Sequence, residues 1–194
     1  MEKDKLQVDF SVFGRAEIVA TYSMVKLLNR GAEIGVYNGE LSLRFLNSFP
    51  ELTVYMVDPY KEWSKDEYKD PANDSQDIQD ARYELMRRTV SCFGDRAKLL
   101  RMTSLEAVKL IEPESLDFVY IDANHHYKYI LEDLREWGKR VRNEGLIMGH
   151  DYSLEWIDVI NAVNRYCLEN DIHYIKVSKC NSDFVILKKK GIEI

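Results

Sequence analysis

Four acidic side chains lie in or directly after short apolar segments of this chain: Glu33, Asp58, Asp122 and Asp151. In an open parallel sheet, ligands bind outside the carboxyl ends of the strands. Carboxylates that recur at that edge can accept hydrogen bonds from a ligand or coordinate a metal ion. These four residues are therefore the first candidates for a functional site.

Two glycines follow the first of these acids in G-x-x-x-G spacing, at Gly35 and Gly39. Glycine lets the backbone pass close to a ligand, and a helix predicted to start near Glu40 would offer free N–H groups. A dinucleotide site would normally show G-x-G-x-x-G, so this spacing argues against a pyrophosphate. A tight turn between strand and helix, with no ligand, explains such glycines as well unless other residues support a site.

Asp58 comes directly after the apolar segment 52–57, about twenty residues after the glycines, where a carboxylate can accept hydrogen bonds from ribose hydroxyls. Taken by itself, Asp58 is equally compatible with a helix cap or a turn. Together with the glycines it favours a nucleoside cofactor.

Histidines gather beside the other two acids. Asp122 is followed by His125 and His126, and Asp151 is preceded by His150, so three of the four histidines of the chain lie in two short segments. Two carboxylates on neighbouring strand ends could hold a divalent cation and leave one imidazole free as a base. The alternative is that both acids cap the following helices and the histidines are ordinary loop residues.

The elements that must position these residues follow from the apolar pattern. Strand-length apolar segments alternate with stretches of helical period at 78–92, 130–141 and 157–167. Such alternation predicts an α/β fold, with a doubly wound and mostly parallel sheet covered by helices on both faces. The seven predicted strands are 32–36, 52–57, 97–102, 116–121, 145–148, 172–177 and 184–187.

The end of the chain departs from this alternation. The last two predicted strands are separated only by residues 178–183, which is too short for a parallel crossover. One antiparallel strand near the C-terminus is therefore expected to complete the seven-stranded sheet. We expect residues 1–194 to form a single domain, because the chain has 45% apolar residues and no break in composition.

Composition also indicates the cellular compartment in which the protein is expected. No apolar segment approaches the roughly 20 residues of a membrane span, and the charged segment Met1–Val8 is unlike a signal peptide. The three cysteines, Cys92, Cys167 and Cys180, are far apart and lack C-x-x-C spacing, which argues against disulfides and thiolate zinc sites. We expect a cytoplasmic protein that does not associate with membranes.

Charge narrows the class of partner. The net charge is −6, and basic residues cluster only at Lys188–Lys190, so the chain has no electrostatic footprint for nucleic acid. A small-molecule substrate is the expected partner. The sequence does not determine the oligomeric state, and a homo-oligomer is one of the possibilities.

Residues 59–77 are polar and without a clear period, which predicts a long loop at the ligand edge, either a lid or a surface insertion. Trp137, at helical spacing, is expected in the core. Aromatic residues in the loop and after Asp151 could equally wall an acceptor or pack elsewhere: Tyr60, Trp63, Tyr68, Tyr152 and Trp156.

Several of these motifs resemble the class I S-adenosylmethionine-dependent methyltransferases. The second half of the pattern is similar to a branch of small-molecule O-methyltransferases that use a divalent metal. The resemblance covers residues 31–152. Its motifs are E-x-G-x-x-x-G at 33–39, I-D-x-x-H-x-Y at 121–127, D-L at 133–134 and G-H-D-Y at 149–152.

The resemblance implies a role for each candidate residue. The cofactor, S-adenosylmethionine, would be bound on its methionine and ribose side by Glu33, Gly35, Gly39 and Asp58, with Ser104 near the adenine and Asp122 also at the cofactor. The metal ligands would be Asp122, Asp151 and His150, and His125 would be the general base. Mg or Mn is the expected ion, although an imidazole at position 150 suits Mn, Fe or Zn better than Mg, and metal use itself stays open.

The predicted function is methyl transfer from S-adenosylmethionine to a hydroxyl of a small molecule, such as a sugar or a polyketide-like acceptor. One rival is a nicotinamide-dependent oxidoreductase, which the missing third glycine disfavours. A second rival is a non-catalytic protein that keeps the cofactor-binding fold.

Overall fold

The computed structural model describes residues 28–66, 68, 70, 72–173, 175–177 and 182–188. Three sequence features lie wholly or partly outside the described residues: Met1–Val8, Cys180 and the basic cluster Lys188–Lys190. Within the described part of the chain, no helix is both long enough and apolar enough to cross a membrane.

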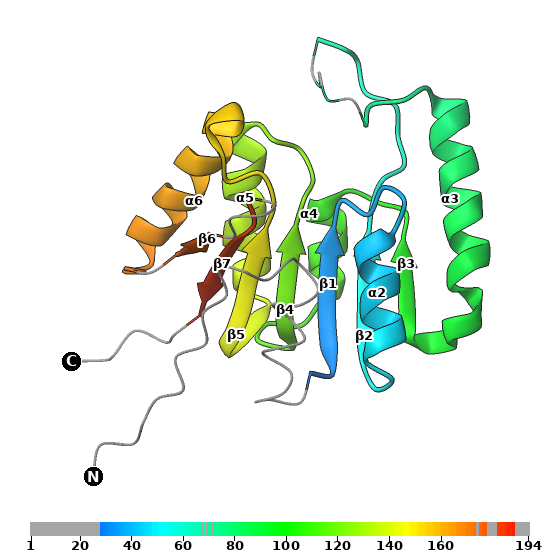
Figure 1. Ribbon diagram of the computed structural model, residues 1–194, viewed down its shortest axis with the longest axis horizontal. Helices are drawn as coiled ribbons and strands as arrows, with labels where there is room; N and C mark the ends of the chain where they lie inside the picture. Colours follow the sequence, from blue (N-terminus) through cyan, green and yellow to red (C-terminus); the bar gives the residue numbers. More distant parts are fainter. Residues whose placement is uncertain are drawn as a thin grey trace.

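The centre of the molecule is a twisted sheet of seven strands, as predicted (Figure 1). Its order is β3-β2-β1-β4-β5-β7-β6; the first five are mutually parallel, and β7 runs antiparallel to both of its neighbours. The single antiparallel strand near the C-terminus is thus confirmed. The strands are β1 (Arg30–Ile34), β2 (Thr53–Val57), β3 (Ala97–Leu100), β4 (Leu116–Ile121), β5 (Val141–Gly149), β6 (Lys176–Val177) and β7 (Phe184–Leu187).

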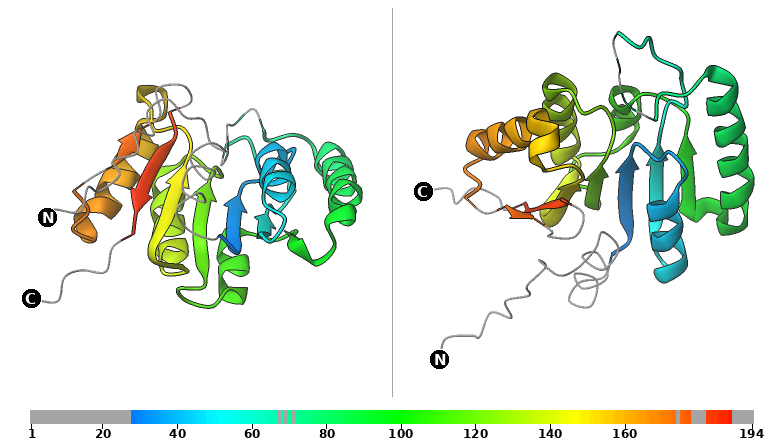
Figure 2. Two further views of the ribbon diagram at one scale, coloured as in Figure 1. Left: turned by 60° about the horizontal axis from the view of Figure 1, so that its bottom comes forward. Right: turned by 45° about the horizontal axis from the view of Figure 1, so that its top comes forward.

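Helices cover both faces of the sheet, which makes three layers (Figure 2). On one face α4, α5 and α6 bury their apolar sides in a core centred on Trp137, and on the other face α2 and α3 pack in a second core centred on Phe45. The α-helices are α2 (Glu40–Ser48), α3 (Gln76–Val90), α4 (Ser104–Ala107), α5 (Tyr127–Gly138) and α6 (Ile157–Glu169). Short 3-10 helices are η2 (Ser91–Arg96), η3 (Val108–Leu110) and η4 (Leu154–Trp156).

The predicted bounds agree with the structure for β4 and β7, and the largest differences are at β5 and β6. β5 begins at Val141 rather than at residue 145, because its pairing with β4 shifts register between Leu116 and Phe118. Glu144 has φ 58° within this irregular part, which interrupts the apolar pattern that the prediction relied on. The strand predicted over 172–177 is reduced to β6.

The strand order places a topological switch between β1 and β4. From β1 the chain moves outward through β2 and β3, and it then returns to the other side of β1 as β4 and moves outward through β5. At such a point the connections leave the carboxyl ends of the strands in opposite directions and open a crevice there. The loop after β2 rises above this same edge (Figure 1).

Candidate functional site

A cavity of about 390 Å³ lies at the switch point. Four predicted site residues line it: Gly35, Asp58, Ser104 and Asp122. The other predicted cofactor residues, Glu33 and Gly39, are not among the described residues of this lining. The sequence prediction therefore found the position of the cavity but not the direction of every side chain.

Glu33 turns away from the cavity and into the protein. Its side chain is buried, and its carboxylate accepts hydrogen bonds from both the backbone N–H and the hydroxyl of Ser42. α2 begins after Gly39, which has no side chain to cap the helix. Glu33 thus supplies the anionic cap of α2 from the neighbouring strand, where the positive end of the helix dipole favours it.

This cap predicts a stability effect at Ser42. Ser42→Ala removes the hydroxyl donor and leaves a buried carboxylate with one fewer partner, which is expected to cost roughly 1–3 kcal/mol. Urea unfolding followed by circular dichroism measures it. The matched control is Ser91→Ala, which removes an exposed hydroxyl that donates to Arg88 O. An equal change in both variants would contradict the capping role of Glu33.

Gly35 brings the ends of β1 and β4 into contact. Its φ is +86°, which favours glycine, and a Cβ at this position would collide with the backbone carbonyl of Asp122. The N–H of Asp122 in turn donates to Ile34 O at 2.8 Å. The glycine therefore sets how closely Asp122 approaches the start of the cofactor loop.

Asp58 braces the same loop. Its Oδ2 accepts from the N–H groups of Val36 at 3.0 Å and Tyr37 at 2.9 Å, and its Oδ1 accepts from the N–H of Tyr60 at 2.8 Å. Burial raises the pKa of Asp58 above its ordinary value, although these three N–H groups lower it. The carboxylate is a wall of the cavity and also fixes the backbone on both of its sides.

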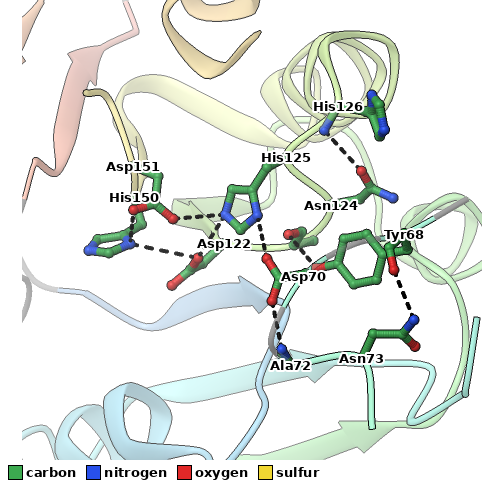
Figure 3. Close-up of polar contacts among 11 residues, drawn as sticks. Tyr68, Asp70, Ala72, Asn73, Asp122, Asn124, His125, His126, His150 and Asp151 are labelled. Carbon is green, nitrogen blue, oxygen red and sulfur yellow. Dashed lines mark hydrogen bonds and ion pairs between the residues drawn. The ribbon is translucent and has the colours of Figure 1, made fainter. Parts of the chain in front are cut away.

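At the edge of the sheet, His125 is surrounded by three carboxylates (Figure 3). Its Nδ1 lies 3.0 Å from Asp70 Oδ2, and its Nε2 lies 2.8 Å from Asp151 Oδ2 and 3.7 Å from Asp122 Oδ1. His150 approaches from the other side, with Nδ1 3.0 Å from Asp151 Oδ1. The two histidine segments predicted from the sequence do meet here.

The three carboxylates around His125 affect the protonation of this predicted general base. Burial alone would lower its pKa, but the contacts with Asp122, Asp151 and Asp70 together raise the pKa to about 11. The contacts with His125 and His150 hold the pKa of Asp151 below its usual range against the effect of burial. With the carboxylates in these positions, the protonated form of His125 is favoured.

Asp122 and Asp151, two of the predicted metal ligands, lie close together. Their ligand atoms and that of His125 lie within 4.8 Å of one another, whereas the predicted third ligand, His150, is not in this group. His150 Nδ1 is 3.9 Å from Asp122 Oδ1 and contacts Asp151 more closely, so it acts as a partner of a carboxylate in this structure.

The aromatic residues divide between core and cavity. Tyr60 is 1% exposed and packs in the core, so the second of its two alternatives, packing elsewhere, is the one that the structure has. Trp63 and Tyr68 do line the larger cavity. The ring of Trp156 lies against His125, with the two centroids 4.3 Å apart.

A second cavity of about 200 Å³ adjoins the first and is lined in part by His125. Tyr68 and Asn124 belong to the walls of both cavities and so separate them. The second cavity is also lined by Asp70, His125, His126, Glu155, Trp156, Ile157 and Asp158. Two adjoining chambers with a polar cluster between them can hold two reactants side by side.

Sequence reasoning missed Asp70. It lies in the loop between β2 and α3, among other acids with no periodic pattern. It contacts His125, although the two residues are 55 positions apart in the sequence. Contact with His125 lowers the pKa of Asp70, although burial alone would raise it. The nearest sequence clue was the prediction of a long loop at the ligand edge over residues 59–77.

Comparison with known families gives one match. The family model described as "Methyltransferase domain" matches residues 32–152, a range that contains the cofactor loop, Asp58, Asp122, His125 and Asp151. No curated protein sequence matches the chain significantly.

Solved structures share the fold at low sequence identity. The O-methyltransferase NovP has a TM-score of 0.69 at 12% identity, over 90% of this chain and 78% of that one. An O-methyltransferase from Bacillus cereus, in complex with SAH, has a TM-score of 0.61 at 14% identity, over 89% and 80%. A methyltransferase from Geobacter sulfurreducens has a TM-score of 0.61 at 13% identity, over 93% and 81%. These similarities establish the Rossmann-like methyltransferase fold.

Proposed function

This chain belongs to the methyltransferase domain family, and we propose that it transfers a methyl group from S-adenosylmethionine to a hydroxyl of a small molecule. The observation that carries the proposal is the pair of adjoining cavities, with Asp122 in the wall of the larger one and His125 in the wall of the smaller one. The larger cavity, at the switch point of the sheet, would hold the cofactor, and the smaller one would hold the acceptor. The names of two structural neighbours as O-methyltransferases, one of them solved with SAH, support this assignment.

The larger cavity has groups suited to each part of the cofactor. Gly35 lies in its wall at the end of β1, and Asp58 would offer its remaining lone pairs to the ribose hydroxyls. Ser104 also lines this cavity, and we propose that it lies near the adenine. The volume of about 390 Å³ is in the range of small-molecule sites.

Methyl transfer is a displacement at a sulfonium. The acceptor oxygen forms the new O–C bond as the C–S bond breaks with its electron pair left on sulfur, and the hydroxyl proton passes to a base. The chain has to align the two reactants and to make the oxygen nucleophilic. We propose that His125 receives the proton at Nε2, since Asp70 holds its Nδ1.

Asp122 and Asp151 favour the protonated form of His125. His125 can accept the hydroxyl proton once these two carboxylates move away from it. Its Nε2 is buried and makes no hydrogen bond of acceptable geometry, which suits a site prepared for another partner. Carboxylates are ligands that divalent cations accept, so Asp122 and Asp151 fit a metal ion, which would draw them away from His125. A divalent cation held there would polarise the acceptor hydroxyl and lower its pKa.

The proposal predicts cation-dependent binding. Calorimetric titration with S-adenosylhomocysteine should show micromolar affinity, and Mn²⁺ should raise the melting temperature of the wild-type protein more than that of Asp122→Asn, because a carboxylate ligand is lost. Asp171→Asn is the matched control, since its carboxylate is exposed and contacts only His173 among the described ion pairs. An equal Mn²⁺ shift in all three proteins would contradict the metal site, and no binding of S-adenosylhomocysteine with or without EDTA would contradict the cofactor.

A further inference from the structure

Asp133 lies in the wall of the larger cavity although only 6% of it is exposed. It is on α5, and burial raises the pKa of its carboxyl group to about 7. A carboxyl group is costly to bury unless donors reach its oxygens. Among the residues that the structure describes, Ser104 is the one that donates a hydrogen bond to it, at Oδ1. Its other oxygen therefore has capacity for a ligand in the cavity.

The hydrogen bonds behind Asp133 have a fixed direction. The indole Nε1–H of Trp137 can only donate, and it donates to Ser104 Oγ at 2.7 Å. The one hydroxyl proton of Ser104 is then directed to Asp133 Oδ1. Trp137 is wholly buried, so this chain of donors has no alternative orientation that satisfies all three groups. The oxygen of Asp133 that faces Ser104 must therefore be an acceptor, and the other oxygen is the one that faces the cavity.

We propose that Asp133 reads the base of the cofactor, by accepting a hydrogen bond from the exocyclic amino group of adenine. The inference rests on the proposed function and adds a specificity-determining residue to it. Hypoxanthine carries an oxygen where adenine carries this amino group, so a carboxylate acceptor would discriminate between the two bases. A site built to pair with a donor rejects an analogue that lacks it, because a buried polar group is then left unpaired.

The other hydrogen-bond donors of the cofactor, its ammonium group and its ribose hydroxyls, would lie away from Asp133. The reacting sulfur has to lie near His125, and the ammonium group is only a few bonds from that sulfur. The ribose hydroxyls have Asp58 as an acceptor. The adenine amino group is the donor furthest from the sulfur, and the wall formed by Ser104, Leu105 and Asp133 offers a buried acceptor beside an apolar side chain.

Two ligands test the proposal on the wild-type protein without any substitution. S-Adenosylhomocysteine and S-inosylhomocysteine differ at the base, and calorimetry should give at least tenfold tighter binding of the adenosyl compound. Equal affinity for the two would overturn the role of Asp133. Binding of neither compound would instead overturn the proposed function, so the two failures are distinguishable.

Asp133→Asn then replaces the acceptor that faces the cavity with a hydrogen-bond donor. Ser104 still donates its proton, so the oxygen of the new amide must turn to Ser104 and its NH₂ must turn to the cavity, where it matches the oxygen of hypoxanthine. The expected result is at least a tenfold fall in adenosyl affinity and a gain for the inosyl compound. Glu136→Gln, on the same helix and paired with Lys139, is the control, and its ratio should equal that of the wild type.

Two further variants keep the proposal falsifiable. In Ser104→Ala combined with Asp133→Asn, the amide is free to turn its oxygen toward the cavity, so adenosyl binding should recover relative to the single variant. Asp133→Ser, whose hydroxyl both donates and accepts, should bind the two compounds with similar affinity. Retention of the wild-type ratio in any folded Asp133 variant would overturn the assignment.

Discussion

Replacing His125 with alanine is expected to lower kcat by a factor of about 10² to 10⁴, the usual contribution of a positioned acid–base group. The affinity for S-adenosylhomocysteine should change by less than about twofold, because His125 lines the smaller cavity and not the larger one. Single-turnover kinetics on an identified hydroxyl acceptor, together with calorimetry, separate the two quantities.

A control for this substitution is a histidine outside both cavities. His173→Ala removes a side chain that is 76% exposed and should leave kcat nearly unchanged. Added imidazole should restore part of the activity of His125→Ala if the lost group moves a proton. An equal loss of turnover and of cofactor affinity, with no rescue by imidazole, would show that His125 only supports the structure of the site.

Asp58→Ala is expected to weaken cofactor binding at least tenfold. Hydrogen bonds to a charged group contribute on the order of 1.5–3 kcal/mol each, and one such bond to the ribose already accounts for that factor. The substitution also removes the acceptor of the N–H groups of Val36, Tyr37 and Tyr60, so the loop itself should loosen. Calorimetry measures affinity, and thermal unfolding measures the loss of stability.

Asp58→Asn, which keeps the shape of the side chain, gives a more specific expectation for the stability of the loop. In Asp58→Asn, whichever way the amide turns, its NH₂ group faces at least one backbone N–H, so the variant should be destabilised despite its unchanged shape. Asp66→Ala, in the same loop and exposed, is the control. Normal affinity in a folded Asp58→Ala protein would remove Asp58 from the cofactor site.

The order of elements could be predicted because alternation of strand and helix periods is a local property of the sequence. β4 and β7 begin and end where the apolar pattern does. Asp58, Asp122 and Asp151 were found for the same reason, since a carboxylate directly after a buried strand is conspicuous. Boundaries failed where the backbone departs from regular geometry, as at Glu144 in β5.

Directions of side chains and long-range contacts could not be predicted. Glu33 has the position of a cofactor ligand, but the uncapped start of α2 provides it with a closer partner inside the protein. Asp70 belongs to a loop whose path the sequence does not determine, although its contact with His125 is central to the cluster. Such choices depend on which polar groups the rest of the fold leaves without partners.

The wall that Tyr68 and Asn124 share between the two cavities has a thermodynamic consequence. A ligand that shifts either side chain changes the shape of the neighbouring chamber, so occupancy of one chamber alters the affinity of the other. Such coupling is reciprocal: if the first reactant strengthens binding of the second, the second strengthens binding of the first by the same factor. A shared partition thus links the two binding equilibria without a separate regulatory site.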